Sequence, residues 1–449
     1  MFTNHLQLNY AAALRHYDIF PKVIPAGKTS VITVMPLGAQ AAFAPGEHRL
    51  RVCPRHEGSP RAFPDRPNNF EYAVTADADG CIRFSFEFFS EQQYNIHIGD
   101  KLKFSVYAVD GDLVGRYPFR GDLHMHSCRS DGQLAPALVC AEYRKIGYDF
   151  MAITDHGKYE PSLEAIAAYK DVPIEMTLVP GEEIHLPCDY ENKRINEQHI
   201  INFGGGKSIN AMAKSDPEAH WAAVEAYAET IDIPETLTGA ERYTYASCLW
   251  AYNEVKKCGG LSHFCHPFDS SVFRAPPTFA DAILASGAFG ALEVLGGDTG
   301  FDQNGFQTIQ YYEDRARGRR YPIVGVTDSH DAFLADNPDA NVASTLVFSP
   351  ANETRALIDS IENFYSVAVD TIHDTRRYVG ELRLVRYANF LGNNFIPLHD
   401  ELCFEEGRAM KDYVCGKAGS SAFGAAGAEE ILRLISGRMK AQREKYFAF

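Results

Sequence analysis

Histidine and acidic residues recur in short clusters along residues 122–331, at spacings that suit metal binding. In the first cluster His124 and His126 are two residues apart, so on a β-strand both imidazoles would project from one face towards one ion. Asp131 follows on the loop just beyond them. A single His-x-His pair also arises when polar strand residues alternate, and this cluster alone would favour that structural explanation.

Acidic residues and histidines also follow the next two apolar runs. Asp155 and His156 end the first of these runs, where Asp155 could orient His156 through a hydrogen bond or the pair could merely cap a loop. Glu182 and Glu183 follow Thr177–Val179, and only one of two neighbouring side chains can face the same side of a strand. The residues alone do not decide which of the two carboxylates would bind a metal.

Three later clusters add further residues of ligand type. His199 opens an apolar strand, His263 and His266 lie at the end of another, and Asp328 and His330 repeat the two-residue spacing of the first cluster. Imidazole and carboxylate ligands together suit Zn²⁺, Mn²⁺ or Fe²⁺. Because there are more such residues than one tetrahedral ion needs, the sequence predicts more than one metal ion.

This ordered set of motifs resembles the PHP family, the polymerase and histidinol phosphatase domains, over about residues 119–372. The resemblance implies a metal-dependent phosphoesterase with two or three divalent ions at the mouth of a distorted (β/α)₇ barrel. The family's motifs place a ligand second after a glycine and another directly before a proline, which selects Glu183 over Glu182 and His266 over His263. The implied sets are His124, His126, Glu183 and Asp328 for one ion, Asp131, His156 and His330 for a second, and His199 and His266 with a shared Glu183 for a third.

Such a site would hydrolyse a phosphate ester, because clustered divalent ions lower the pKa of bound water to about 7 and stabilise the oxygens of an in-line displacement. A metal-activated hydroxide would attack phosphorus in a small phosphorylated substrate, without a serine or cysteine nucleophile. Arg129 and Lys158 could contact the phosphate, although each could equally be a solvated loop cation. Asp155 and Asp331 could relay a proton to the leaving group, and Arg274 is a weaker candidate for a phosphate contact.

The elements that must position these residues alternate between strand and helix from Arg120 onward. Apolar strands are expected at Asp122–His124, Met151–Ile153, Thr177–Val179, His199–Phe203, Gly260–Ser262, Ala291–Val294 and Ile323–Val326. Helices are expected at Leu134–Ile146, Tyr245–Cys258 and Gly305–Arg317. This alternation predicts an α/β fold with parallel strands covered by helices, and about seven repeats favour a barrel over an open sheet. The predicted ligands would then gather at the carboxyl ends of the strands.

Two flanking regions and one insertion depart from the barrel pattern. Residues 1–118 alternate apolar and polar side chains, as in Ile82–Phe88, which predicts an antiparallel β-sandwich with a structural or dimerising role. Residues 204–246 are expected to be a lid or specificity insertion in the barrel, and their Gly204–Lys207 turn is only a weak phosphate-loop signal. Residues 373–449 are predicted to be a helical C-terminal extension.

Length, charge and cysteine content exclude several classes of protein. A chain of 449 residues suggests two or three domains, and a net charge of −16 argues against a surface that holds long nucleic acid. No apolar run approaches the roughly 20 residues of a membrane helix, and the first residues lack a signal-peptide pattern. Ten cysteines without regular spacing indicate reduced thiols and a cytoplasmic location. A homo-oligomer is compatible with the sequence.

Three functions of different class fit these observations. The first is the phosphoesterase described above, acting on a small phosphorylated molecule. The second is a metal-dependent hydrolase of a non-phosphate bond, such as an amide or a lactone, because similar ligands on barrels serve other reactions. The third is a carbohydrate-binding or partner-binding protein in which the metal site is structural. The ordered ligand set favours the first.

Overall fold

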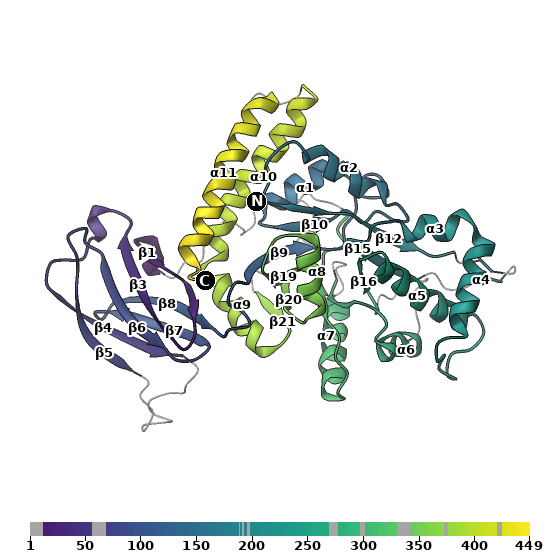
Figure 1. Cartoon of the computed structure of the whole chain (residues 1–449), viewed down its shortest axis with the longest axis horizontal. Helices are drawn as coiled ribbons and strands as arrows, with labels where there is room; N and C mark the ends of the chain where they lie inside the picture. The colour runs from purple at the N-terminus through teal and green to yellow at the C-terminus, as the bar shows by residue number, and fades with distance from the viewer. Residues whose placement is uncertain are drawn as a thin grey trace. The chain divides into compact units, whose positions relative to one another are not determined.

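The computed structural model describes residues 12–55, 69–187, 189–190, 193–194, 198–268, 277–296, 301–330, 343–371, 376–419 and 424–449 (Figure 1). Contacts divide these residues into two compact units. The first unit contains Tyr117–Glu381 and Cys403–Arg433, and the second contains the residues up to Arg116 with Leu382–Leu402 and Leu434–Phe449. The segment predicted as a C-terminal extension therefore contributes to both units. No helix among the described residues is both long and apolar enough to span a membrane.

The second unit contains two β-sheets, as the alternating pattern before residue 118 predicts. Their strands are β1 (Tyr17–Phe20), β3 (Lys28–Pro36) and β6 (Ile82–Phe88) in one sheet, and β2 (Val23–Pro25), β8 (Leu102–Val109), β7 (Gln92–Ile98), β4 (Glu47–Pro54) and β5 (Phe70–Thr75) in the other. All the ladders are antiparallel except the pairing of β2 with β8. Ile32 and Phe84 of one sheet share a buried apolar cluster with Leu50 and Phe104 of the other. Two short 3₁₀ helices, Ala12–Arg15 and Ala39–Ala41, complete this region.

The first unit is a mixed α/β structure with two large sheets. The six-stranded sheet has the order β11 (Thr177–Val179), β10 (Phe150–Ala152), β9 (Tyr117–Asp122), β19 (Ala343–Ser349), β20 (Ser366–Asp370) and β21 (Arg377–Val379). The five-stranded sheet has the order β12 (Gly181–His185), β15 (His199–Phe203), β16 (Leu261–Phe264), β17 (Ala291–Leu295) and β18 (Ile323–Gly325). A small hairpin, β13 (Asp189–Tyr190) and β14 (Lys193–Arg194), lies between β12 and β15 in the chain.

Strands lie at six of the seven predicted positions, whereas the strand expected at Asp122–His124 is β9, which runs earlier and ends at Asp122, and the pairing of the strands is only partly parallel. The ladders β9–β10–β11 and β16–β17–β18 are parallel, whereas β12–β15–β16 and β9–β19–β20–β21 are antiparallel. The expectation of parallel strands throughout is therefore wrong. A β-hairpin rather than a helix joins β12 to β15, and parallel neighbours need a longer crossover connection. The described ladders form two sheets, and the closed barrel stays a prediction.

Helices cover the first unit and pack it together. They are α1 (Pro136–Lys145), α2 (Glu160–Tyr169), α3 (Ile209–Ser215), α4 (Pro217–Ala228), α5 (Ala240–Lys257), α6 (Pro277–Ser286), α7 (Phe301–Ala316) and α8 (Thr354–Glu362). Between the sheets, Phe150 and Val347 of one share a buried cluster with Phe203 and Val324 of the other. This shared core places the ends of strands from both sheets close to one another.

The C-terminal region, predicted to be helical, contains three helices among its described residues. They are α9 (Leu382–Asn394), α10 (Ile396–Lys417) and α11 (Gly424–Tyr446). In the first unit, Met410 and Tyr413 of α10 pack into a buried cluster with Val139 and Tyr143 of α1. In the second unit, Arg383 of α9 forms ion pairs with acidic residues of the β-sheet region.

Candidate metal centre

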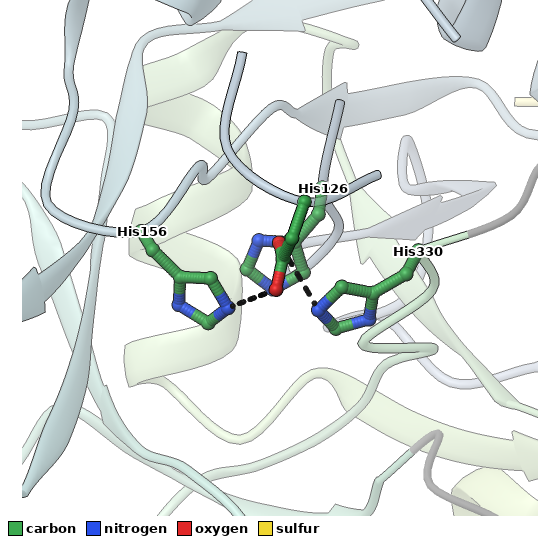
Figure 2. Close-up of side chains that lie close together, drawn as sticks. His126, His156 and His330 are labelled. Atoms are coloured by element: carbon green, nitrogen blue, oxygen red, sulfur yellow. Dashed lines mark ion pairs between the residues drawn. The ribbon is translucent and has the colours of Figure 1, made fainter. Parts of the chain in front are cut away.

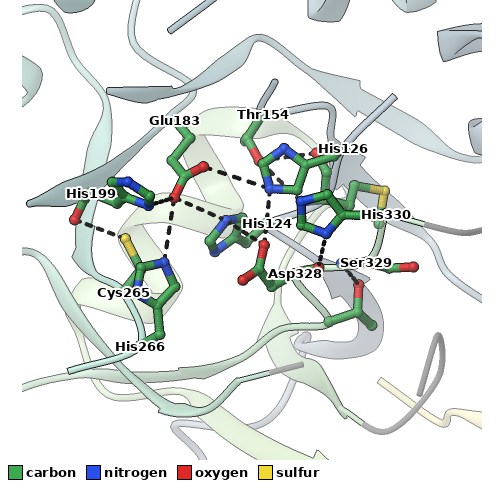
Figure 3. Close-up of polar contacts among 12 residues, drawn as sticks. His124, His126, Thr154, Glu183, His199, Cys265, His266, Asp328, Ser329 and His330 are labelled. Carbon is green, nitrogen blue, oxygen red and sulfur yellow. Dashed lines mark hydrogen bonds and ion pairs between the residues drawn. The ribbon is translucent and has the colours of Figure 1, made fainter. Parts of the chain in front are cut away.

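The nine predicted ligands lie at neighbouring strand ends and converge on one site. His124 and His126 follow β9, His156 follows β10, Glu183 lies on β12, and His266 follows β16. Two isolated bridges, Met125 with Ser329 and His156 with Glu183, continue the strands beyond their ladders and join the two sheets. Figure 3 shows side chains from these separate segments pointing into a common space.

His199 reaches the same site because β15 runs antiparallel to β12. The register pairs His199, the first residue of β15, with His185, the last residue of β12. The start of an antiparallel strand therefore lies where its neighbour ends. This pairing explains how a histidine at the beginning of a strand joins ligands that lie at the ends of others.

The solvent-facing part of the site contains His126, Asp131, His156 and His330, whose ligand atoms lie within 4.8 Å of one another. Asp131 Oδ2 is 3.3 Å from Nε2 of His156, and Asp131 Oδ1 is 3.4 Å from Nε2 of His330. Figure 2 shows these two imidazoles on opposite sides of the carboxylate. The His126 ring stacks with both of them at centroid distances of 4.2 Å. Side-chain exposures of 54% for Asp131 and 40% for His330 make this part of the site accessible.

A deeper part of the site contains His124, His126 and Asp328. Asp328 Oδ1 lies 3.1 Å from Nε2 of His124 and 2.9 Å from Nε2 of His126. Both histidine side chains are fully buried. Asp328 has a φ of 49°, so the backbone turns in the left-handed region to present this carboxylate.

Glu183 lies at the centre of the site. Its carboxylate is within 3.6 Å of both His124 and His126, 2.8 Å from Nδ1 of His199, and 3.4 Å from Nε2 of His266. It also contacts Nδ1 of His156. The structure thus brings all nine predicted residues together, while their roles as metal ligands stay predictions. The central position of Glu183 suits a carboxylate shared between ions.

Its neighbour Glu182 points elsewhere. Glu182 Oε1 accepts hydrogen bonds from the backbone N–H of Ile209 at 2.6 Å and from Nδ2 of Asn202 at 3.1 Å, and Oε2 accepts one from the hydroxyl of Ser208 at 2.6 Å. Two adjacent strand residues face opposite sides, so one carboxylate turns to the histidines and the other to the insertion. This geometry agrees with the choice of Glu183 as the ligand.

Two side chains in the site, the partly buried His185 and the fully buried Glu293, were missed by the sequence reasoning. Nε2 of His185 is 2.8 Å from Nδ1 of His156, and its ring stacks on that of His199 at 4.0 Å. His185 could have been predicted from its position two residues after Glu183, because the first histidine pair has the same spacing. Glu293 was detectable as a lone charge within the apolar strand Ala291–Leu295.

Glu293 connects two segments that carry ligands. Its Oε1 lies 3.3 Å from Nδ1 of His124, and its Oε2 accepts a 2.7 Å hydrogen bond from the backbone N–H of His266. A carboxylate can only accept, so Nδ1 of His124 donates its proton to Glu293, and Nε2 is the nitrogen left for a metal. Burial lowers the pKa of His124, but the carboxylates of Asp328, Glu293 and Glu183 outweigh burial and raise this pKa well above its usual value, so a metal ion would bind in exchange for the proton on Nε2. His266 has a φ of 30°, and the bond from Glu293 helps to hold this unusual backbone conformation.

The three residues predicted to be catalytic lie beside the ligands but have protein partners. Asp155 accepts hydrogen bonds from the backbone and hydroxyl of Ser127 at 2.8 and 2.5 Å, and from the backbone and hydroxyl of Ser130 at 3.2 and 2.5 Å. It therefore holds the loop that carries Asp131. Arg129 pairs with Glu164 at 2.8 Å, and Nζ of Lys158 donates to the carbonyl of Arg129. Their catalytic roles stay predictions, and Asp331 and Arg274 lie outside the described residues.

The alternative histidine of the fourth cluster, His263, is completely buried on β16. Neither ring nitrogen has a hydrogen-bond partner in the described structure, and its ring centroid is 6.4 Å from that of His124. Burial lowers the pKa of His263 well below its usual value, so the neutral ring is favoured. His263 belongs to none of the groups of possible ligands in the described structure, and the choice of His266 stays a prediction.

Charges in the site are strongly coupled. Burial raises the pKa of Glu183 and of Asp328, but the nearby imidazoles, above all His199 for Glu183 and His124 for Asp328, outweigh burial and hold both pKa values well below their usual range. Burial lowers the pKa of His199 to about 4 despite the attraction of Glu183. Ionised carboxylates beside a neutral imidazole are the protonation states in which these groups bind metal ions.

Unsatisfied ligand atoms provide a test of whether a metal fits. Nε2 of His124, Nδ1 of His126, Nδ1 of His199 and Oε2 of Glu183 are buried without a hydrogen-bond partner in the described structure. Burying several such atoms without hydrogen bonds is costly, and their mixed imidazole and carboxylate chemistry is that of a zinc, manganese or iron site. The residues present therefore fit divalent metal ions.

Comparisons with known proteins give distant similarities. No family model matches the chain. A DNA polymerase/3′-5′ exonuclease PolX of Bacillus subtilis is 31% identical over 136 residues, and the match spans 28% of this chain but only 22% of that protein. The chain thus covers about a fifth of the length of this curated relative.

Two solved structures also resemble the chain. One is a two-domain protein from Bacteroides vulgatus with a predicted PHP-like metal-dependent phosphoesterase, at 16% identity and a TM-score of 0.37, covering 57% of this chain and 65% of that one. The other, from Bifidobacterium adolescentis, is provisionally assigned as a metal-dependent phosphoesterase, at 19% identity and a TM-score of 0.32, covering 46% of this chain and 87% of that one.

Proposed function

We propose that the chain is a metal-dependent phosphoesterase that hydrolyses a small phosphorylated molecule at a multinuclear site. The observation that carries this proposal is the convergence of nine predicted ligands, Glu183 among them, on one site, with ligand atoms of His124, His126 and His199 buried and without hydrogen-bond partners in the described structure. Imidazoles that lie within 3.6 Å of Glu183 and Asp328 without hydrogen-bond geometry are arranged as they would be around shared metal ions.

The proposed ligand sets follow the clusters in the structure. One ion would be held by His124, His126, Glu183 and Asp328; a second by Asp131, His156 and His330; and a third by His199 and His266 with Glu183 shared. His185 lies within ligand distance of the second and third sets and could complete either. Zn²⁺, Mn²⁺ and Fe²⁺ all accept this combination of imidazole and carboxylate.

Divalent ions bound here would supply Lewis acidity and activation of water at neutral pH. The side chains of the protein hold the predicted ligands in position. Glu293 keeps the proton of His124 on Nδ1, and Asp155 fixes the loop that presents Asp131. His156 and His330 hold the accessible side of the site, where a phosphate group could approach. We also propose that Arg129 and Lys158, besides their contacts within the loops, contact that phosphate.

Elemental analysis and a substrate panel test this proposal together. Protein purified without added metal should contain zinc, manganese or iron, hydrolyse phosphomonoesters or phosphodiesters, lose activity on chelation and regain it when metal is restored. Metal-loaded protein that is inert towards all phosphoesters but cleaves amides or lactones would contradict it and favour the non-phosphate hydrolase. Metal-loaded protein inert towards both panels would favour a structural metal site.

The remaining sequence expectations carry over as proposals. We propose a β-sandwich for the second unit, supported by the apolar cluster that its two sheets share. The two bridges that join the sheets of the first unit support a distorted barrel. A small phosphorylated substrate, no long nucleic acid and a cytoplasmic location remain supported by the charge of −16 and the unpatterned cysteines.

A further inference from the structure

The insertion at residues 204–246 is attached directly to the candidate metal centre. Its first helix, α3, begins beside Glu182, whose carboxylate accepts hydrogen bonds from the side chain of Ser208 and the backbone of Ile209, each at 2.6 Å. Glu182 is the residue next to the central carboxylate Glu183. A shift of α3 relative to the metal ligands would break these buried charge-assisted bonds, so the helix has a fixed position beside the site.

Asn210 on the same helix ties α3 to the end of β12 and to the loop that follows His156. Its Oδ1 accepts a hydrogen bond from the backbone N–H of His185 at 3.1 Å, and its Nδ2 donates to the carbonyl of Gly157 at 2.7 Å. Gly157 directly follows the predicted ligand His156. Asn210 is itself buried. These two hydrogen bonds fix α3 next to the part of the site that faces solvent.

Lys214 lies one helical turn beyond Asn210 and on the same face of α3. A Cβ placed on Gly157 would be 3.4 Å from Nζ of Lys214 and 3.3 Å from Nδ2 of Asn210, so the ammonium group reaches the backbone next to His156. Within the described part of the chain, Lys214 has no carboxylate within 4.0 Å of Nζ.

Two other cations of this region do have a carboxylate partner. Arg129 pairs with Glu164 at 2.8 Å, and Lys207 of the insertion lies 3.7 Å from Glu254. An exposed ammonium group beside the partly exposed His156, in a chain with a net charge of −16, is available for an anionic ligand that approaches the site. Lysine binds phosphate as a compact point charge with three donors.

We propose that Lys214 binds the phosphate of the substrate, and that the insertion selects phosphorylated substrates by placing this ammonium group beside His156. This inference rests on the proposed function, since it assigns a recognition residue to the same site. Lys214 would act in binding, while the reaction itself depends on the metal ligands.

Binding of inorganic phosphate to the full-length, metal-loaded protein tests the role of Lys214 without requiring turnover. We expect Lys214→Gln to weaken phosphate binding about tenfold, because one hydrogen bond to a charged group is lost, and Lys214→Arg to retain most of it. The matched control is Lys207→Gln, which removes the same charge from the same insertion at a paired position. Metal content by elemental analysis should be equal in all four proteins.

Steady-state kinetics with a phosphomonoester then separate the two proposals. If Lys214→Gln raises KM about tenfold with little change in kcat, both are supported. If the wild type hydrolyses phosphoesters but Lys214→Gln leaves phosphate affinity and KM within twofold of the wild type, or Lys207→Gln weakens them equally, the inference on Lys214 is overturned and the phosphoesterase stands. If phosphate binding depends on Lys214 but no phosphoester is hydrolysed, the recognition site stands and the proposed reaction fails.

Discussion

At the residue scale, the site is built from side chains whose neighbours decide which atoms can act. Glu183 faces the histidines because it alternates with Glu182 along β12, and His124 presents Nε2 because Glu293 occupies its Nδ1. A buried acid such as Glu293 can control the binding of a metal ion without contacting the ion. It fixes the tautomer and the orientation of an imidazole that does contact the ion.

Glu293→Gln tests that control. The amide can offer an oxygen to only one of the two N–H groups that Glu293 now serves, so its NH₂ would face either His124 or His266. We expect metal affinity to fall roughly 10- to 100-fold, measured by competition with a chelating dye. Asp314→Asn is the control, because Asp314 is an equally buried acid that binds Tyr321 and Arg319. Equal metal affinity in wild type and Glu293→Gln would show that Glu293 has no such role.

The identity of the ligand residues could largely be proposed from sequence, but their surroundings could not. Residues such as Asp328 and His330 are recognisable because their two-residue spacing is a local property of the sequence. His185 shared that spacing with Glu183 and could have been found by the same rule. Glu293 acts on His124, which is 169 residues away, and nothing local in the sequence specifies that contact.

At the element scale, the periodicity of the sequence predicted the positions of most strands and helices, but it did not predict which strands pair or in which direction. The run at His199–Phe203 was expected to be a strand, and it is one. Its antiparallel pairing depends on the hairpin that replaces a crossover helix between β12 and β15, and Ala343–Ser349 and Ser366–Asp370 were not anticipated as strands at all. Side-chain periodicity reports which face is buried, whereas the neighbour of a strand is chosen by the rest of the chain.

The insertion offers a pH-dependent prediction at this scale. His220 on α4 packs against Trp221 and Trp250 at centroid distances of 5.0 and 4.7 Å, and neither of its ring nitrogens has a hydrogen-bond partner in the described structure. Burial lowers the pKa of His220 to about 4. Because the unfolded chain takes up this proton near pH 6.5 and the folded chain only near pH 4, acidification through this window favours unfolding.

His220→Phe should remove that contribution. We expect the wild type to lose about 2 kcal/mol more stability than the variant between pH 6.5 and pH 4, after allowance for partial solvent screening. Urea unfolding followed by tryptophan fluorescence reports on this region, since Trp221 and Trp250 are the two tryptophans of the chain. The titrating metal ligands are common to both proteins and cancel in the difference. Parallel pH profiles for the two proteins would refute the prediction.

At the scale of the whole molecule, distant parts of the chain complete one folded unit. The buried guanidinium of Arg144 on α1 pairs with Asp149 at 2.8 Å and with Glu406 of α10, and Glu406 also accepts a 2.6 Å bond from the backbone of Glu175. Gly407 packs closely against the backbone of Lys145. The unit that carries the metal centre therefore includes Cys403–Arg433. A domain that ended at residue 372, where the sequence resemblance ends, would lack Glu406 and Gly407.

Glu406→Ala should reveal this dependence. Removing one partner of a buried ion pair leaves Arg144 with less compensation, and we expect a loss of about 3 to 5 kcal/mol in the free energy of unfolding. The control is Glu429→Ala on α11, which removes an exposed pair with Arg433 and should cost at most about 1 kcal/mol. Chemical unfolding followed by circular dichroism measures both. Equal, small losses would mean that α10 contributes little to this unit.

The central claim is that side chains from distant segments hold several divalent ions around Glu183. The most direct measurement is the number of metal ions bound per chain, by elemental analysis of the wild type and of Glu183→Gln after equilibration with Mn²⁺ and removal of free metal. The account predicts two or three ions per wild-type chain and the loss of at least one in Glu183→Gln, since this carboxylate is shared. Fewer than one ion per wild-type chain, or an unchanged number in Glu183→Gln, would contradict it.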